Sequence, residues 1–259
     1  MPAKNKKRTP EQMREFTENV QKHLAEEKKR SGAGMLSDVI LGGQDGLVNV
    51  LGIVLGVASA TSDRFIVLIA GLVATFAESI SMAAVAYTST RAEQDHYRSE
   101  LEQERWEIEH VPEVEEEEIR LIYMKKGFRG KELERMVKSI TSNKELWLSV
   151  MMTEELGLAP IETQNPVRAA AIVGISATVG SVIPLVPFML LSVGEAIIAS
   201  LIISTIVLFA VGAYKAKITI GSWWKSGVEM AVIGMLAALT GWLIGKVLGG
   251  WFGLTNVPA

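Results

Sequence analysis

Glutamate is concentrated in the centre of this 259-residue chain, at spacings that could hold a metal ion. Glu104 and Glu107 are three residues apart, and Glu115 and Glu118 repeat that spacing. Residues three apart are neighbours on one face of a helix, where two like charges cost roughly a few tenths of a kcal/mol. If a hairpin brought the two pairs together, the repulsion would increase and a divalent cation would relieve it.

A methionine pair and one more carboxylate follow further along the chain, as Met151, Met152 and Glu155. Carboxylate oxygens alone would suit Mg²⁺, Ca²⁺ or Mn²⁺, whereas a thioether sulfur shifts the preference towards Fe²⁺ or a later transition metal. A second interpretation stays open, because a Glu-rich run is usually a solvated helix face. A methionine pair on an amphipathic helix usually belongs to the core.

The composition predicts a chain with a membrane part and a water-facing part. Hydrophobic residues make up 49% of the sequence, which is high for a soluble domain, and charged residues still make up 21%. The net charge of −3 averages a basic amino terminus, an acidic centre and a nearly uncharged carboxyl-terminal half. Because there is no cysteine, disulfides, zinc–thiolate sites, iron–sulfur clusters and cysteine nucleophiles are excluded. Metal ligands must then come from Glu, Asp, His or Met.

Five apolar runs are each near the roughly 20 residues that a helix needs to cross a ~30 Å hydrocarbon core. They cover about residues 36–60, 65–87, 167–191, 194–214 and 228–248. We therefore predict an all-α integral membrane protein with five transmembrane helices. Lys and Arg are concentrated before the first run, between the second and third, and between the fourth and fifth. The positive-inside rule then places the amino terminus in the cytoplasm and the carboxyl terminus outside.

This topology predicts four parts of the chain. They are a cytoplasmic amino-terminal segment (1–34) with an amphipathic helix over Pro10–Lys29, transmembrane helices one and two (35–90), a cytoplasmic metal-binding helical domain (91–165), and transmembrane helices three to five (166–259).

The cytoplasmic domain is expected to contain three helices. The first starts near Thr90 and stops before Pro112, because proline fits the first turn of a helix but not its interior. The second runs from Pro112 to Lys126, and the third from about Lys131 to Gly157.

Two ionisable residues and a methionine lie inside the first two apolar runs. They are Asp45, Glu78 and Met82. Ionisable side chains within a membrane are costly and are functional candidates by default. Asp45 and Met82 each lie nine residues from the predicted cytoplasmic end of their helix, about 14 Å deep at 1.5 Å per residue. With Glu78 one turn further out, the three could line one polar path. Alternatively, Asp45 pairs with Gln44 or Asn49, or makes only a helix-packing hydrogen bond.

Further motifs are spread along the chain. They are Asp45-Gly46-Leu47-Val48, Ser79-Ile-Ser-Met82-Ala, the Glu-rich helices, Tyr123 with Gly127, Met151-Met152-Thr-Glu-Glu155-Leu-Gly-Leu158, and Asn165-Pro166 leading to Ile183-Pro-Leu-Val-Pro187. In this order and spacing, over about residues 35–250, they resemble the vacuolar iron transporter family. The resemblance implies five transmembrane helices and a homodimer with the translocation path between the protomers. It also implies movement of Fe²⁺, often with Mn²⁺, out of the cytosol in exchange for protons.

The same resemblance implies a metal-binding set and a membrane path. The family's metal-binding domain uses four glutamates of its first two helices with a methionine pair and a glutamate of the third. By position these fall on Glu104, Glu107, Glu115, Glu118, Met151, Met152 and Glu155. Asp45 and Met82 match the family's path residues.

The chain departs from the family pattern in one place, and one assignment has alternatives. Many members carry a Gly-Glu-Tyr run just after the methionine of the second span, where this chain has Val85-Ala86-Tyr87. That carboxylate is missing, and Glu78 could replace it. A slip of one helical turn could also move the metal-binding assignment onto neighbouring glutamates, namely Glu100, Glu102, Glu109, Glu113, Glu116 and Glu117.

We therefore expect a dimeric exporter of Fe²⁺ or a similar divalent cation in the cell membrane, and not an enzyme. The metal ion is the substrate, no prosthetic group is expected, and the partners are the metal ion, the lipid bilayer and a second copy of the chain. The acidic centre disfavours nucleic-acid binding. A membrane-tethered metal sensor or buffer stays open as an alternative. A di-iron oxidase would need Glu-x-x-His pairs on several helices, and only Glu93 with His96 and Glu107 with His110 match.

Overall fold

The structure is a computed structural model that describes residues 14, 17, 22, 33–61, 63–159, 165–219 and 221–252. Within those ranges all regular secondary structure is helical. Five helical segments of the described chain are long and apolar enough to cross a membrane: 36–60, 64–110, 166–190, 193–218 and 223–251. The predicted all-α membrane fold with five spans is thus confirmed. The amphipathic helix expected over Pro10–Lys29 lies outside the described residues, apart from three single positions.

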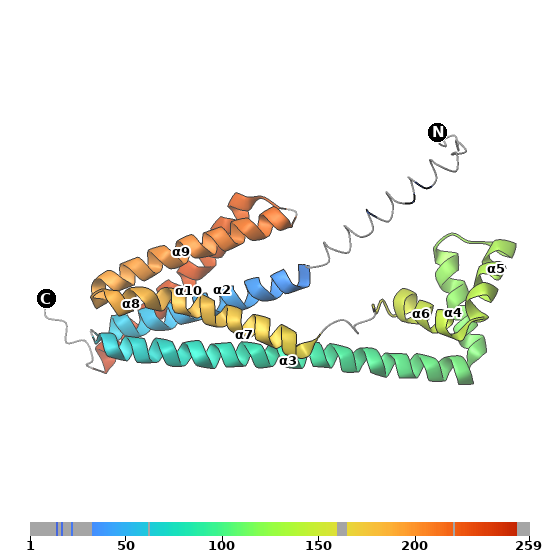
Figure 1. Cartoon of the computed structure of the whole chain (residues 1–259), viewed down its shortest axis with the longest axis horizontal. Coiled ribbons are helices and arrows are strands. Elements are labelled where there is room, and N and C mark those ends of the chain that lie inside the picture. The colour runs from blue at the N-terminus through green and yellow to red at the C-terminus, as the bar shows by residue number, and fades with distance from the viewer. Residues whose placement is uncertain are drawn as a thin grey trace. The chain divides into compact units, whose positions relative to one another are not determined.

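The chain divides into two compact units (Figure 1). The first unit comprises residues up to Met82 and from Ala171, and the second comprises Ala83–Ala170. The first contains α2 (Ala33–Ala60), the start of α3 (Arg64–His110), most of α7 (Pro166–Val182), the 3₁₀ turn η2 (Ile183–Leu185), α8 (Val186–Leu190), α9 (Val193–Ile218) and α10 (Trp223–Trp251). The second contains the rest of α3 with α4 (Pro112–Lys125), α5 (Gly130–Thr141), α6 (Lys144–Val150) and the π-helical turn η1 (Met151–Glu155).

Helix α3 differs from the sequence prediction, which ended the second span near residue 87 and started a new helix near Thr90. The structure has one helix of 47 residues, because no proline or glycine follows Gly71 to interrupt it. At 1.5 Å per residue it is about 70 Å long, more than twice the thickness of a ~30 Å hydrocarbon core. The charged part of α3 from Arg91 onwards therefore extends beyond the membrane-spanning part.

The third span is also not one regular helix. Pro184 and Pro187 divide it into α7, η2 and α8, since proline supplies no backbone N–H and its ring crowds the preceding turn. The Ser200 hydroxyl of α9 donates a hydrogen bond to the Pro184 carbonyl oxygen (2.9 Å). This contact satisfies a backbone acceptor and joins α9 to the broken span.

Helix α2 lies against both α7 and α10 (Figure 1), and glycines permit the close approach. A Cβ atom at Gly46 would clash with the Ala177 carbonyl oxygen of α7. A Cβ atom at Gly245 of α10 would clash with the Gly56 carbonyl oxygen of α2. Small residues at such contacts are typical of membrane helices, where packing replaces the hydrophobic driving force. These contacts hold Asp45 and Asn49 of α2 at a fixed position among the neighbouring helices.

The second unit has its own apolar core. The core consists of Ile108, Ile119, Leu133, Val137, Ile140, Trp147, Val150 and Met151. The third helix predicted for this region, from Lys131 to Gly157, is divided into α5, α6 and η1. The division falls at Asn143, whose side-chain oxygen accepts hydrogen bonds from the backbone N–H groups of Glu145 and Leu146 and so caps α6. The break lets η1 turn back towards α4.

We expect Gly245→Ala to destabilise the membrane unit, because the added methyl group would press on the backbone of α2. Overpacking of this kind costs about 1–3 kcal/mol, which corresponds to a melting temperature lower by about 5 °C. The matched control is Gly250→Ala on the same helix, where a Cβ atom would meet nothing within 4 Å. Thermal melting of both variants in one detergent tests this. Equal melting temperatures would show that the α2–α10 contact is not tight.

Candidate metal site

The hairpin between α3 and α4 brings three glutamates together. Val111 ends α3 by donating its N–H to the Glu107 carbonyl oxygen (2.8 Å), and Pro112 begins α4. Across this turn, one carboxylate oxygen each from Glu104, Glu107 and Glu115 lie within 4.8 Å of one another. The i, i+3 spacing therefore places two carboxylates of α3 opposite the start of α4.

The π-helical turn η1 supplies a further carboxylate. One oxygen each from Glu115, Glu118 and Glu155 lie within 4.8 Å of one another, so Glu115 belongs to both groups of three. An ion pair between Lys126, just after α4, and Glu154 joins η1 to the end of α4. The other four glutamates that the sequence singled out thus lie around Glu115.

The geometry of η1 explains how two adjacent methionines can both be buried. Met151 and Met152 are 0% and 1% exposed. The Met151 carbonyl oxygen accepts from the N–H of Leu156 (3.2 Å), five residues on, which is the hydrogen bond of a π-helix. This wider turn separates neighbouring side chains by less than the 100° of an α-helix. Gly157 then ends the turn at a φ of +67°, in the left-handed region that favours glycine.

The two methionines have different surroundings. Met151 belongs to the apolar core of the second unit, as expected if its role is packing. Met152 is equally buried but lies outside the core clusters found among the described residues. Of the two sulfur atoms, that of Met152 is therefore the better candidate for a metal ligand.

Burial of like charges dominates the electrostatics of this site. Glu104 and Glu115 are only 5% and 3% exposed. Burial, followed by repulsion from the Glu155, Glu115, Glu107 and Glu118 carboxylates, raises the pKa of Glu104 to about 7. Burial and the charges of Glu118, Glu107 and Glu155 raise the pKa of Glu115 to about 7. Glu155 is exposed as a residue, but partial desolvation of its carboxyl group, followed by the charges of Glu118 and Glu107, also raises its pKa.

The positive charges nearby interact with other carboxylates. Arg120 pairs with Glu116, Glu117 and Glu134, and Lys144 pairs with Glu109. His96 lies beside Glu100, and Glu102 and Glu113 are exposed. The sequence left open that neighbouring glutamates, one helical turn away, are the metal ligands. In the structure these neighbours lie in ion pairs or in solvent. Within the described part of the chain, the buried Oε2 atoms of Glu104 and Glu115 have no hydrogen-bond partner.

This donor set fits a divalent cation. Buried polar atoms are normally paired, and a carboxylate left unpaired in a low-dielectric site is costly. A divalent cation would supply the missing partner for both Oε2 atoms and offset the mutual repulsion of the carboxylates. Carboxylate oxygens alone suit Mg²⁺, Ca²⁺ or Mn²⁺, and a thioether ligand such as Met152 would shift the preference towards a borderline cation.

A second polar group lies in the membrane unit. The Asn49 side-chain amide of α2 donates a hydrogen bond to Oε1 of Glu78 on α3 (3.1 Å). The Asp45 carboxyl group, one turn before Asn49, interacts directly with that of Glu78. From the sequence alone, Asn49 was expected only as a possible partner of Asp45. The four-residue spacing between them indicates that both side chains lie on one face of α2. Met82 is half-buried one turn beyond Glu78, and no hydrogen bond among the described residues joins it to this group.

The chain matches known proteins over most of its length. The profile of the VIT family matches residues 36–246. Vacuolar iron transporter 1 of Arabidopsis thaliana is 32% identical over 223 residues, which cover 86% of this chain and 89% of the relative. The protein of the same name from Tulipa gesneriana is 31% identical over 230 residues (88% and 92%). The vacuolar iron transporter of Plasmodium falciparum is 31% identical over 244 residues (90% and 89%).

The chain belongs to the VIT family. The predicted family resemblance is therefore confirmed. This member is a membrane protein of a family whose relatives are named as iron transporters, and a transporter family is not an enzyme class. The family indicates no prosthetic group.

We expect Glu115→Gln to weaken binding of a divalent cation to the full chain by about tenfold or more, because one charged ligand shared by both groups is lost. Isothermal titration with Mn²⁺ measures this. The control is Glu113→Gln, an exposed glutamate two residues earlier on α4 that removes the same charge. Equal affinities for the two variants would exclude Glu115 as a ligand.

Proposed function

We propose that this VIT-family member exports Fe²⁺ or a similar divalent cation from the cytosol in exchange for protons. The observation that carries the proposal is a cluster of five carboxylates, in which Glu115 is shared by two groups of three. Two of these carboxylates are buried with unpaired oxygens. The metal-binding set is Glu104, Glu107, Glu115, Glu118, Met151, Met152 and Glu155.

In this proposal the second unit is cytoplasmic and collects the ion. A cluster of carboxylates attracts divalent cations over a distance and raises their local concentration. The Met152 thioether then favours Fe²⁺ over Mg²⁺ and Ca²⁺, which prefer oxygen ligands alone.

The membrane path in this proposal is formed by Asp45, Glu78 and Met82. Asp45 and Glu78 interact near the middle of their spans, where neighbouring carboxylates are stable only if a proton or a cation compensates their charge. The hydrogen bond from Asn49 orients the Glu78 carboxylate. Met82 adds a soft donor one turn nearer the cytoplasm.

Proton exchange follows from competition at these carboxylates. A proton and a divalent cation each relieve the repulsion between Asp45 and Glu78, and binding of one displaces the other. An acidic exterior then favours release of the metal, and a neutral cytosol favours its binding. Coupling needs no separate proton carrier in this scheme.

We further propose a homodimer with α2 at its interface. A groove of ≈ 650 Å³ between α2 and α10 is lined by Gly52, Gly56, Gly241 and Gly245, with Asn49 at its edge. Asn49 is exposed in the single chain. An exposed amide in the membrane is costly, and a second copy over this face would cover it. The path would then lie between the protomers.

The proposed orientation places the amino terminus in the cytoplasm and the carboxyl terminus outside, following the basic connections. We propose the cell membrane as the location. The relatives are named for the vacuole, whose lumen is topologically equivalent to the cell exterior. Export from the cytosol has the same direction across either membrane.

We expect Asp45→Asn to lower the initial rate of Fe²⁺ transport by about tenfold or more, because a neutral amide cannot bind the cation as a carboxylate does. Proteoliposomes with a chelating fluorophore on the acidic side, tested with Fe²⁺, Mn²⁺, Zn²⁺ and Co²⁺ with and without a pH gradient, measure the rate. Metal binding at the second unit should be unchanged in this variant. The control is Asp95→Asn, an exposed residue of α3 that pairs with Arg91.

Wild-type rates in Asp45→Asn vesicles would refute the path. If the wild-type protein binds Fe²⁺ but moves none, the protein is a membrane-tethered buffer or sensor. Equal rates with and without the pH gradient would refute proton exchange and leave the path intact.

A further inference from the structure

A crevice of ≈ 540 Å³ lies between α2, α7 and α9 in the membrane unit. Its lining is almost entirely apolar and runs from Leu36 to Leu47 on α2 and from Val207 to Tyr214 on α9. The seven-residue separation on α9 corresponds to about 10 Å along the helix axis. That is about two thirds of the ~15 Å hydrocarbon depth of one membrane leaflet. The crevice therefore has the direction and depth of a lipid acyl chain.

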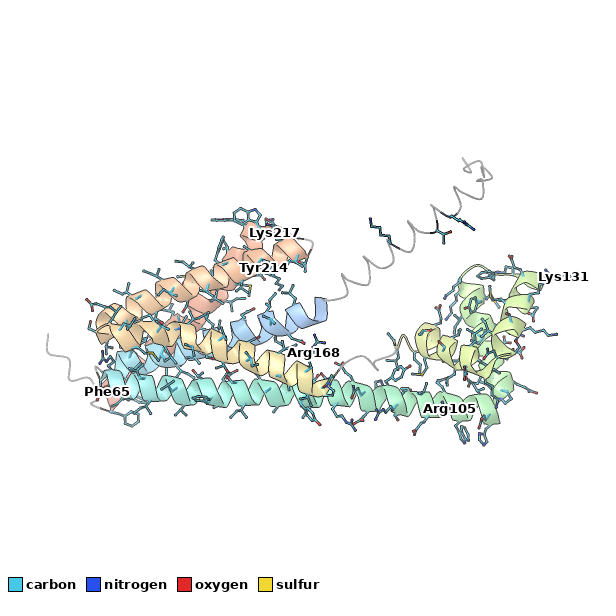
Figure 2. The ribbon with its side chains drawn as sticks, viewed as in Figure 1. Phe65, Arg105, Lys131, Arg168, Tyr214 and Lys217 are labelled. Carbon is cyan, nitrogen blue, oxygen red and sulfur yellow. The ribbon has the colours of Figure 1, made fainter. Side chains whose placement is uncertain are left out.

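A second pocket, of ≈ 470 Å³, adjoins the crevice at the end of α9. Tyr214 lines both, and Lys217 and Trp223 line only the second. Tyr214 and Lys217 are three residues apart and so share one face of α9 (Figure 2). The pocket is thus lined by residues that carry an ammonium, a phenol hydroxyl and an indole N–H, next to the apolar crevice.

The segment that connects α9 and α10 beside this pocket carries positive charge. Lys215, Lys217 and Lys225 flank the connection between α9 and α10, and no Asp or Glu occurs from Tyr214 to Val228. The ion pairs found within the described residues involve other lysines and arginines. Tryptophans such as Trp223 are typical of the membrane–water interface. An anionic group at the level of the lipid headgroups would complement this charge.

We propose that this surface binds one anionic glycerophospholipid, with an acyl chain in the crevice and its phosphate group at Lys217. Tyr214 and Trp223 donate hydrogen bonds to the headgroup. The bound lipid fills the space between α2, α7 and α9 and so supports the helix that carries Asp45. This site is separate from the carboxylate cluster and does not depend on the metal ion transported.

The proposal is tested by native mass spectrometry of the full chain released from mixed micelles containing dioleoylphosphatidylglycerol or dioleoylphosphatidylcholine. The wild-type protein should retain one phosphatidylglycerol molecule per chain and little phosphatidylcholine. Lys217→Gln should lower this retention about fivefold, the effect of one lysine near an anionic lipid. Lys215→Gln is the matched control, because it removes the same charge two residues earlier, about 200° around the helix, and does not line the pocket.

A second variant tests the crevice itself. Ala210 is exposed in the single chain and lines the crevice on α9, so Ala210→Trp should fill the channel and also lower retention. Circular dichroism and gel filtration verify that each variant is folded. Equal retention of the two lipids, equal losses in Lys217→Gln and Lys215→Gln, or unchanged retention in Ala210→Trp would each overturn the proposal.

Discussion

Mutual repulsion among buried carboxylates is the constraint on which the rest of this molecule depends. Glu115 lies in two groups of three carboxylates, and it is 3% exposed. Burial and neighbouring charges raise the pKa of both Glu104 and Glu115 to about 7. Such an arrangement is unfavourable for folding alone, because charged groups are normally placed in water or in ion pairs. The burial of these carboxylates is explained if the site exchanges protons for a cation.

Much of the second unit acts to hold those carboxylates in place. The apolar core that includes Ile108 and Ile119 fixes the α3–α4 hairpin, and the π-turn brings the Glu155 carboxylate to it. Arg120 holds Glu116 and Glu117 away from the cluster. In the membrane unit, two carboxyl groups are again close together, because Asp45 interacts with Glu78. The uncharged Asn49 amide donates a hydrogen bond to Glu78. Both carboxylate sites are suited to a cation that protons can replace.

Sequence reasoning found most of the fold, because twenty-residue apolar runs depend only on local composition. The i, i+3 spacing likewise identified Glu104 with Glu107 and Glu115 with Glu118. Spacing alone could not separate these from Glu116 or Glu117, since that choice depends on where Arg120 points. The π-helical turn at Met151 could not be predicted from the sequence either. Such a turn is stabilised by tertiary packing, and no characteristic amino-acid composition marks it. The contact between Asn49 and Glu78 depends on the register of two helices. The break before α6 could have been read from Asn143, a good helix cap.

The central claim is that Glu104 and Glu115 hold protons near neutral pH that a divalent cation displaces. Titrating Mn²⁺ into the full chain by calorimetry, in buffers of different ionisation enthalpy, counts the protons released on binding. With both pKa values raised to about 7, a substantial share of these carboxyl groups is protonated at pH 7. Binding should then release about one proton per chain at pH 7 and almost none at pH 8.5, with tighter binding at the higher pH. Mn²⁺ binding at pH 7 without proton release would contradict the account, because the carboxylates would then be ionised already and their charges compensated in another way.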